Sequence, residues 1–341
     1  MKVLITGGAG FIGSNFVRHI LVAHASWEVV NLDKLTYAGN LANLKDVEQD
    51  PRYSFIEGDI ADGDIVGRLM ARGVDVVVNF AAESHVDRSI EDPSPFIDTN
   101  VRGTQVLLES VRKHHVTRFV QVSTDEVYGT LGQEGKFSED SPLAPNSPYA
   151  ASKAAADLLC RSYFHTYGLP VMVTRCSNNY GPHQYPEKLI PLVVTNAMEG
   201  KPIPVYGKGL NVRDWIFVEE HCRAIDAIIA QGRPGETYNI GADCERANIE
   251  IVYAILDIMG KPRSLVQFVS DRPGHDWRYA LDTIKLNREI GWQPVYSLNA
   301  HLERTVRWYM DNEEWWRPLK SVDYYEYYER TYGRRRCQKT G

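Results

Sequence analysis

The stretch KVLITGGAGFIG, residues 2–13, decides the fold. Its first five residues are typical of a buried strand, and glycines follow at positions 7, 8, 10 and 13, which satisfies both GxGxxG and the variant GxxGxxG. Because these positions carry no Cβ atom, the backbone can turn tightly and approach a pyrophosphate at the N-terminus of the next helix. We therefore predict a strand, a dinucleotide-binding turn and a helix that begins near Phe11.

Asp33 ends the next apolar run, WEVVNLD, about 20 residues beyond the glycines. A carboxylate there can accept hydrogen bonds from both ribose hydroxyls and repels a 2′-phosphate, so NAD is favoured over NADP. Lys34 works against this preference. Asp59, which ends the run YSFIEGD, is a candidate adenine contact. The alternative interpretation is a glycine-rich turn beside two surface acids.

Six short apolar runs alternate with helical stretches in the first half of the chain: KVLIT, WEVVNLD, YSFIEGD, VDVVVNFAA, RFVQVST and PVMVTRC. This alternation predicts an α/β fold with a doubly wound (Rossmann) parallel sheet, whose ligands bind beyond the carboxyl ends of the strands. The pattern breaks after Cys176. We expect a Rossmann domain over residues 1–177, to which residues 213–241 return, and a smaller mixed α/β substrate lobe over residues 178–341.

The bulk properties exclude several classes of protein. A chain of 341 residues with 43% hydrophobic content can bury a large core, and a net charge of −6 gives no electrostatic footprint for nucleic acid. The five cysteines match no metal-ligand spacing, which indicates a reducing compartment and no metal site. No apolar run approaches about 20 residues, so we expect a cytoplasmic protein without membrane contact. The residues Arg334, Arg335 and Arg336 form a solvated tail or, alternatively, contact an anion or partner.

Tyr149 and Lys153 lie one helical turn apart in SPYAASK, residues 147–153. An ammonium group near a phenol lowers the phenol's pKa, so that the tyrosine can remove a proton from a sugar hydroxyl. About one chance YxxxK is expected in a chain with 19 tyrosines, so the pair carries weight only through its position. It follows the fifth apolar run, whose end offers Ser123 and Thr124 as hydroxyl partners.

Two carboxylates, Asp125 and Glu126, come directly after Thr124. Adjacent residues of a strand point to opposite faces, so both can serve one site only if the strand ends near Thr124. One carboxyl group kept protonated by burial and by its charged neighbour, beside one that is ionised, makes an acid and base pair. The alternative is that Asp125 caps a helix and Glu126 favours the helix dipole.

The segments TGGAGFIG and STDEVYG, the acid Asp33 and the YxxxK pair resemble the extended short-chain dehydrogenase/reductase family that acts on nucleotide sugars. The blocks STDEVYG, DKLTYAGN, AAESHVDRSI and DRPGHDWRYA are similar to the dTDP-glucose 4,6-dehydratases in particular. The resemblance runs from Met1 to about Tyr332. It implies a lyase (hydro-lyase) that converts dTDP-glucose to dTDP-4-keto-6-deoxyglucose, an early step towards deoxysugars such as rhamnose, with NAD tightly bound and regenerated in each turnover.

The chemistry of such a reaction needs both acids. Oxidation at C4 of the sugar makes the C5 proton acidic, and water then leaves across C5 and C6. A base takes the C5 proton, an acid protonates the departing C6 hydroxyl, and hydride returns to C6. The resemblance implies that Asp125 is the acid and Glu126 is the base.

The resemblance also implies which residues form the site. The catalytic residues are Thr124, Asp125, Glu126, Tyr149 and Lys153. NAD contacts come from Gly7, Gly10, Phe11, Ile12, Gly13, Asp33, Lys34, Leu35, Thr36, Asp59, Ile60, Ala81, Ala82, Thr99, Tyr149, Lys153 and Asn179. Substrate contacts come from Ser84, Thr124, Asn178, Lys188, Leu189, Pro204, Tyr206, Arg213, Asn248, Arg272 and His275. Arg213 is the expected diphosphate clamp, because a guanidinium binds phosphate oxygens bidentately. Without the resemblance, a solvated lysine is an equally good interpretation of Lys188, and a structural histidine is an equally good interpretation of His275.

Three further expectations concern assembly, packing and alternatives. The helices near residues 96–114 and 149–167 carry outward apolar residues (Leu158, Leu159 and Phe164), which fits the homodimer that the family implies. The aromatic residues near the C-terminus (Trp308, Trp315, Trp316, Tyr324, Tyr325, Tyr327 and Tyr328) are expected to pack the substrate lobe. The competing functions are a nucleotide-sugar 4-epimerase, a decarboxylase, and a non-catalytic NAD-binding regulator on the same scaffold.

Overall fold

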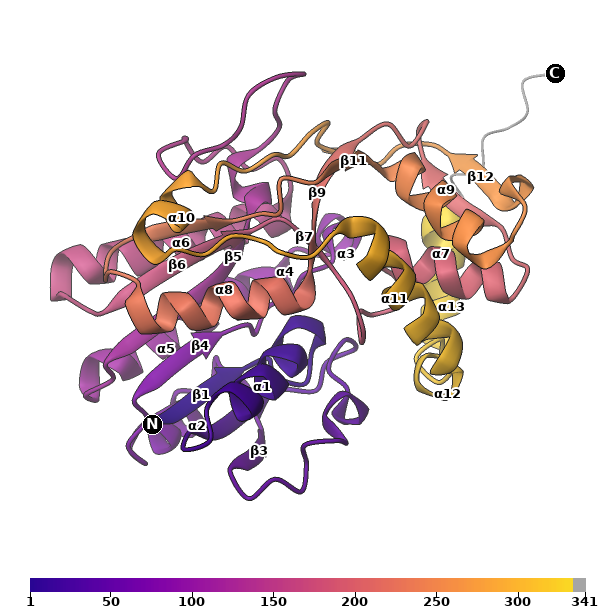
Figure 1. Cartoon of the computed structure of the whole chain (residues 1–341). Coiled ribbons are helices and arrows are strands. Elements are labelled where there is room, and N and C mark those ends of the chain that lie inside the picture. Colours follow the sequence, from indigo (N-terminus) through magenta and orange to yellow (C-terminus); the bar gives the residue numbers. More distant parts are fainter. Residues whose placement is uncertain (334–341) are drawn as a thin grey trace.

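A sheet of seven parallel strands forms the centre of the protein, seen in a computed structural model that describes residues 1–333 (Figure 1). The strand order is β10-β6-β5-β4-β1-β2-β3, and every neighbouring pair is parallel. The predicted doubly wound sheet is confirmed. All six predicted strands are present, and β10 adds a seventh at the edge. The strands are β1 (Lys2–Thr6), β2 (Glu28–Asp33), β3 (Tyr53–Glu57), β4 (Val76–Asn79), β5 (Arg118–Thr124), β6 (Val171–Cys176) and β10 (Thr237–Ile240).

Helices cover both faces of this sheet because the strands are apolar on both sides. Along β1, Val3 and Ile5 point into one core cluster, and Leu4 points into the other. The first cluster is completed by α1 (Phe11–Ala23), α8 (Val218–Gln231) and α10 (Ile284–Ile290), and the second by α2 (Gly63–Met70), α5 (Thr104–Lys113) and α6 (Pro148–Tyr167). The segment before α5 contains α3 (Val86–Glu91), α4 (Ser94–Phe96) and the π-helix η2 (Ile97–Gly103).

A smaller lobe lies at the carboxyl ends of the strands (Figure 1). It holds a three-stranded sheet of order β11-β9-β7 and a two-stranded sheet of β12 and β8. These strands are β7 (Asn178–Tyr180), β8 (Ile203–Tyr206), β9 (Val212–Phe217), β11 (Glu245–Ala247) and β12 (Val266–Val269). The helices of the lobe are α7 (Leu189–Met198), α9 (Asn248–Met259), α11 (Leu298–Asp311), α12 (Glu313–Trp316) and α13 (Val322–Tyr328).

The chain crosses between the lobes more than once. Within the segment 213–241, β9 pairs with β7 and β11 of the small lobe, whereas α8 and β10 belong to the layers of the large sheet. The predicted packing role of the C-terminal aromatics is confirmed for Trp316, which belongs to the core of the small lobe, and for Trp308 and Trp315, which are partly buried and pack against that core. Tyr325 differs, because it is 37% exposed. The predicted tail at Arg334–Arg336 lies outside the described residues.

Within residues 1–333, none of the helices combines the length and the apolar character that crossing a bilayer requires.

Candidate active site

A single cavity opens at the carboxyl ends of β1, β2, β4, β5 and β6, where the sequence predicted the ligands. It extends from the glycine turn to α6 and the start of the small lobe. Of the residues predicted from the sequence, it is lined by Gly7, Gly10, Phe11, Ile12, Gly13, Asp33, Lys34, Thr36, Asp59, Ile60, Ala81, Ala82, Ser84, Thr99, Thr124, Asp125, Glu126, Tyr149, Lys153, Asn178, Asn179 and Lys188.

The glycine turn fits a dinucleotide. Gly7 has φ +69°, and a Cβ there would lie 2.6 Å from the Ala81 nitrogen, so only glycine is accommodated. A Cβ on Gly13 would lie 2.2 Å from the Gly7 oxygen, which shows how closely α1 approaches the turn. Gly10 lines the cavity, and a Cβ on it would meet only the Gly7 oxygen within 4 Å. A side chain at position 10 would therefore project into the space that a pyrophosphate needs.

Asp33 is fixed at the end of β2. Its carboxylate accepts hydrogen bonds from the backbone N–H groups of Ala9 (2.9 Å) and Leu35 (2.8 Å). Burial raises the pKa of Asp33, and these two hydrogen bonds oppose that shift. Lys34 lies 2.7 Å from Asp59, and this ion pair reduces the attraction that Lys34 could offer a 2′-phosphate. The sequence indicated that Asp59 ends the third strand. β3 ends at Glu57, so Asp59 lies instead in the loop that follows the strand.

Tyr149 and Lys153 lie on α6 as predicted, but their electrostatics differ from the prediction. The sequence predicted that Lys153 lowers the pKa of Tyr149. This prediction is wrong for the protein without bound ligands. Burial, followed by the Glu126 carboxylate, raises the pKa of Tyr149 well above its ordinary value. The Lys153 ammonium donates a hydrogen bond to the Val122 carbonyl at 2.6 Å. The spacing of the pair did not reveal how deeply both groups are buried.

Asp125 and Glu126 both reach the cavity because β5 ends at Thr124, as the two-acid hypothesis requires. They form the first turn of the 3₁₀-helix η3 (Asp125–Tyr128). Thr124 is the N-cap residue of this helix, and its hydroxyl oxygen accepts a hydrogen bond from the Glu126 N–H at 3.3 Å. The alternative in which Asp125 caps the helix is therefore wrong.

The two carboxyl groups have different surroundings. Asp125 is 2% exposed; one oxygen accepts the Thr124 hydroxyl at 3.2 Å, and the other is buried without a hydrogen-bond partner. Burial, and then the neighbouring Glu126, raise the pKa of Asp125 well above its ordinary value. Burial also raises the pKa of Glu126, but Arg272, Arg213 and Lys188 act in the opposite direction. The site therefore favours a protonated Asp125 beside an ionised Glu126.

The cations that act on Glu126 come from separate segments of the small lobe. Lys188 precedes α7, and its ammonium donates to the Ser84 carbonyl at 2.9 Å, so the interpretation as a solvated lysine is wrong. Arg213 is 5% exposed, and its guanidinium donates to the backbone carbonyls of Val212, Asp276 and Trp277. The guanidinium of Arg272 lies 3.4 Å from Asp87.

Two more predicted residues lie beside these cations. The Tyr206 ring packs edge-on against His275, with centroids 5.8 Å apart, and its hydroxyl donates to Asp87 at 3.3 Å. Burial, and then Arg272, lower the pKa of His275 to about 4, so its imidazole is neutral at neutral pH. Of the other predicted substrate residues, Leu189 begins α7, Pro204 lies in β8, and Asn248 begins α9 with a side-chain oxygen that is buried and unpartnered.

The sequence interpretation missed several residues of the site. Tyr37, Glu83, Tyr185 and Glu187 line the cavity. Eight predicted residues are not among those that line it: Leu35, Leu189, Pro204, Tyr206, Arg213, Asn248, Arg272 and His275. The Arg88 guanidinium lies 4.0 Å from the centre of the Tyr37 ring and 3.1 Å from Glu187. Tyr37, Glu83 and Arg88 fall in the blocks DKLTYAGN and AAESHVDRSI, so a signal was present in the sequence. Glu187 directly precedes Lys188.

Comparison with known proteins identifies the family. The family model described as GDP-mannose 4,6 dehydratase matches residues 4–305. A dTDP-glucose 4,6-dehydratase of Xanthomonas campestris pv. campestris (strain B100) is 55% identical over 331 residues, which cover 92% of this chain and 94% of that protein. The chain belongs to the dTDP-glucose 4,6-dehydratase family.

Solved structures of this family superimpose closely. The crystal structure of a dTDP-glucose 4,6-dehydratase from Streptomyces venezuelae, with NAD and TYD bound, has a TM-score of 0.92 and 55% identity, and the match covers 94% of this chain and all of that one. A UDP-glucuronic acid 4-epimerase from Bacillus cereus shares the fold with a TM-score of 0.86 but only 29% identity, over 91% of this chain and 99% of that one. The dehydratase branch is therefore much nearer than the epimerase branch.

Proposed function

We propose that this protein is a lyase that dehydrates dTDP-glucose to dTDP-4-keto-6-deoxyglucose, with NAD as its cofactor. The observation that carries the proposal is the pair Asp125 and Glu126 in a cavity continuous with the dinucleotide turn. Burial and Glu126 raise the pKa of Asp125, whereas Arg272, Arg213 and Lys188 oppose the rise that burial causes in the pKa of Glu126. Relatives that carry out this reaction match nearly the whole chain, and related structures contain NAD.

Binding of NAD falls to the glycine turn and to Asp33, with Tyr149 and Lys153 at the far end of the same cavity. When bound, NAD would supply the acceptor and later the donor of the hydride, and the positive charge of its nicotinamide would favour a phenolate at Tyr149. Tyr149 removes the proton of the C4 hydroxyl, and Thr124 holds that oxygen. Lys153 stays fixed to the Val122 carbonyl and supplies positive charge to the phenolate once the proton has moved.

The elimination step is assigned to the acid pair. Glu126 takes the proton from C5, which the C4 ketone has made acidic. Asp125 donates its proton to the C6 hydroxyl, which leaves as water. Glu126 then returns its proton to C5. One proton must also pass from Tyr149 to Asp125, directly or through solvent, so that both groups regain their starting states. Lys188, Arg213 and Arg272 oppose the rise that burial causes in the pKa of Glu126 and so favour its ionised form, and we assign their positive charge also to the diphosphate of the substrate.

Three observations favour this function over its rivals. A 4-epimerase performs the same oxidation at C4 but loses no water, so it has no use for a protonated acid beside a base. A non-catalytic NAD-binding regulator has no use for a buried Tyr149 and Lys153 at the end of β5. The decarboxylase alternative requires recognition of a uronate carboxylate, and the cations described above already face Glu126.

The function is tested by incubating the purified protein separately with dTDP-glucose and UDP-glucose and measuring the masses of the sugar nucleotides. We expect the mass of dTDP-glucose to fall by one water, with far slower change of UDP-glucose. An unchanged mass together with inverted stereochemistry at C4 would instead establish an epimerase.

The rate should depend on pH in a bell-shaped manner. The base Glu126 must be ionised, so protonation of its carboxylate reduces kcat on the acidic side. The acid Asp125 must be protonated, so its ionisation reduces kcat on the alkaline side, and its strongly raised pKa widens the active range. Measured pH profiles of kcat should show both limbs. Replacement of Arg272 by Gln removes a cation that faces Glu126 and should move the acidic limb to higher pH.

We further propose a cytoplasmic homodimer. The free thiols among the described residues suit a reducing compartment. Leu158 of α6 is 56% exposed, Tyr167 at the C-terminal end of that helix is 52% exposed, and Ile97 of the adjacent η2 is 52% exposed. These apolar side chains fit a second copy of the chain. Sedimentation should give twice the chain mass, and Leu158→Asp should shift it towards the monomer; a wild-type monomer would contradict the proposal.

A further inference from the structure

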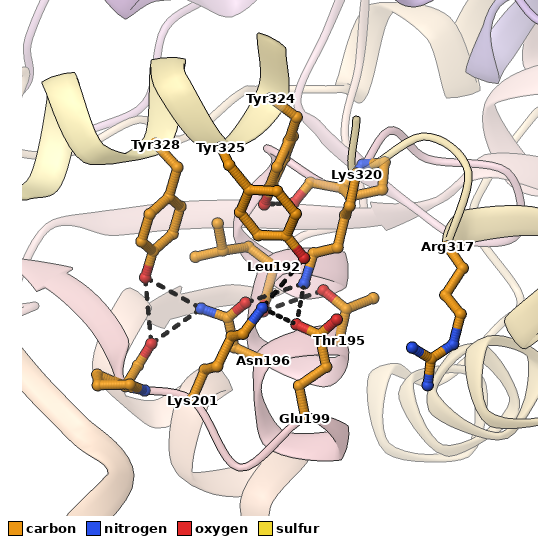
Figure 2. Close-up of polar contacts among 12 residues, drawn as sticks. Leu192, Thr195, Asn196, Glu199, Lys201, Arg317, Lys320, Tyr324, Tyr325 and Tyr328 are labelled. Carbon is orange, nitrogen blue, oxygen red and sulfur yellow. Dashed lines mark hydrogen bonds and ion pairs between the residues drawn. The ribbon is translucent and has the colours of Figure 1, made fainter. Parts of the chain in front are cut away.

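Lys320 is a buried cation at the start of the segment 320–333, which we call the C-terminal strap. Its side chain is 2% exposed, and its ammonium donates to the Asn196 side-chain oxygen at 3.1 Å and to the Glu199 carboxylate at 2.8 Å (Figure 2). The same ammonium lies 5.4 Å from the centre of the Trp316 ring. A lysine is seldom buried unless it is paired, so this side chain serves the fold or the site at a real desolvation cost.

The strap is attached to the end of α7 at a second point. The Asn196 side-chain nitrogen donates to the Tyr328 hydroxyl at 3.1 Å and to the Pro202 carbonyl at 2.9 Å. The Tyr328 hydroxyl in turn donates to the same Pro202 carbonyl at 3.2 Å. Asn196 therefore joins Lys320, before α13, to Tyr328, the last residue of α13 (Figure 2).

Three further contacts of the strap involve segments that lie next to residues predicted to bind the substrate. The Tyr324 hydroxyl donates to the carbonyl of Pro186, which directly precedes the cavity-lining residues Glu187 and Lys188. The Tyr327 hydroxyl lies 3.4 Å from a ring nitrogen of His85, the residue next to Ser84. Beyond α13, the Tyr332 ring packs against Tyr206, with centroids 5.7 Å apart.

We propose that Lys320 is a positioning residue for the nucleotide sugar. By fixing the strap to α7, it holds the segment 185–188 and Tyr206 in the places from which they face the substrate. Lys320 itself touches no substrate. The buried hydrogen bonds of Lys320 hold the strap more firmly than the exposed ion pair between Arg330 and Glu91 does, because exposed ion pairs contribute little to stability. This inference rests on the proposed function, since it concerns binding of the same substrate.

The test is the variant Lys320→Met, which keeps the length of the side chain and removes its charge. We expect the KM for dTDP-glucose to rise roughly tenfold and kcat to fall by a smaller factor, because the strap contacts the binding segment 185–188 and reaches Glu126 only through Lys188. The NAD content should not change. Hydrogen exchange of the backbone amides of residues 322–333 should become faster, while that of β1 and α1 should not.

Arg317→Met is the matched control. Arg317 is a cation three positions away whose side chain is 61% exposed and pairs with Glu313 one helical turn before it. In Figure 2 it stands apart from the cluster. This variant should leave KM and exchange in the strap unchanged. A milder second variant, Tyr328→Phe, should raise the KM about two- to threefold, and it carries the test if Lys320→Met fails to fold.

The outcomes separate the two proposals. If the wild-type protein does not dehydrate dTDP-glucose, the proposed function fails. If the wild type is active but Lys320→Met, or Tyr328→Phe in its place, has an unchanged KM, the positioning role is wrong. A loss confined to kcat would overturn it as well, because displaced binding residues must raise the KM.

Discussion

Replacement of Glu126 by Gln is expected to stop the loss of water while NAD remains bound. The amide keeps the size of the side chain but cannot take the C5 proton, so the rate of dehydration should fall roughly a hundred- to ten-thousand-fold. Oxidation at C4 depends on Tyr149 and can persist at a low level. The measurements are the mass of the sugar nucleotide and the absorbance of reduced nicotinamide after dTDP-glucose is added.

Glu134→Gln is the control, since Glu134 is an exposed glutamate in the loop that follows the same 3₁₀-helix. It should retain the wild-type rate. Asp125→Asn should also stop water loss, but exchange of the C5 proton with solvent should continue there, because Glu126 is intact. Full turnover by Glu126→Gln would remove Glu126 from the mechanism.

Tyr149→Phe is expected to block the reaction one step earlier. Without the phenol no group removes the C4 hydroxyl proton, so reduced nicotinamide should not form and kcat should fall roughly a hundred- to ten-thousand-fold. The KM should change little, because the phenol acts mainly in the transition state. Rapid mixing of enzyme with dTDP-glucose, followed by absorbance, measures this step separately from water loss.

Tyr167→Phe provides the matched control on the same helix. Tyr167 ends α6 and is 52% exposed, so loss of its hydroxyl should leave the rate unchanged. If Tyr149→Phe formed reduced nicotinamide at the wild-type rate, another base would have to be found. Its buried phenol would then have only a packing role.

The fold was predictable because local patterns coincide with tertiary structure here. Each apolar run became a strand, since a parallel sheet buried on both faces needs continuous hydrophobic segments. The glycine turn and Asp33 were equally predictable, because backbone geometry at a strand end allows few residue types. The position of Asp125 and Glu126 beyond the strand followed from the requirement that both reach one site, and β5 does end at Thr124.

The electrostatics of the site were less predictable. The spacing of Tyr149 and Lys153 suggested a lowered phenol pKa, but burial, which no local pattern reports, outweighs the lysine. The cations around Glu126 come from positions 188, 213 and 272, which only the fold of the small lobe brings together. The contact of Arg88 with Tyr37 likewise joins a residue of α3 to one in the loop after β2, and neither segment indicates it alone.

The central claim is that Asp125 is protonated and Glu126 ionised before substrate reacts. Infrared difference spectra of the NAD-bound protein at neutral pH test it most directly, since a protonated carboxyl group has a C=O stretch that a carboxylate lacks. The account predicts a protonated-acid band in the wild type that disappears in Asp125→Asn and persists in Glu126→Gln, because burial is the main cause of the raised pKa of Asp125. A band that is absent from the wild type, or is lost in Glu126→Gln and kept in Asp125→Asn, would contradict the account.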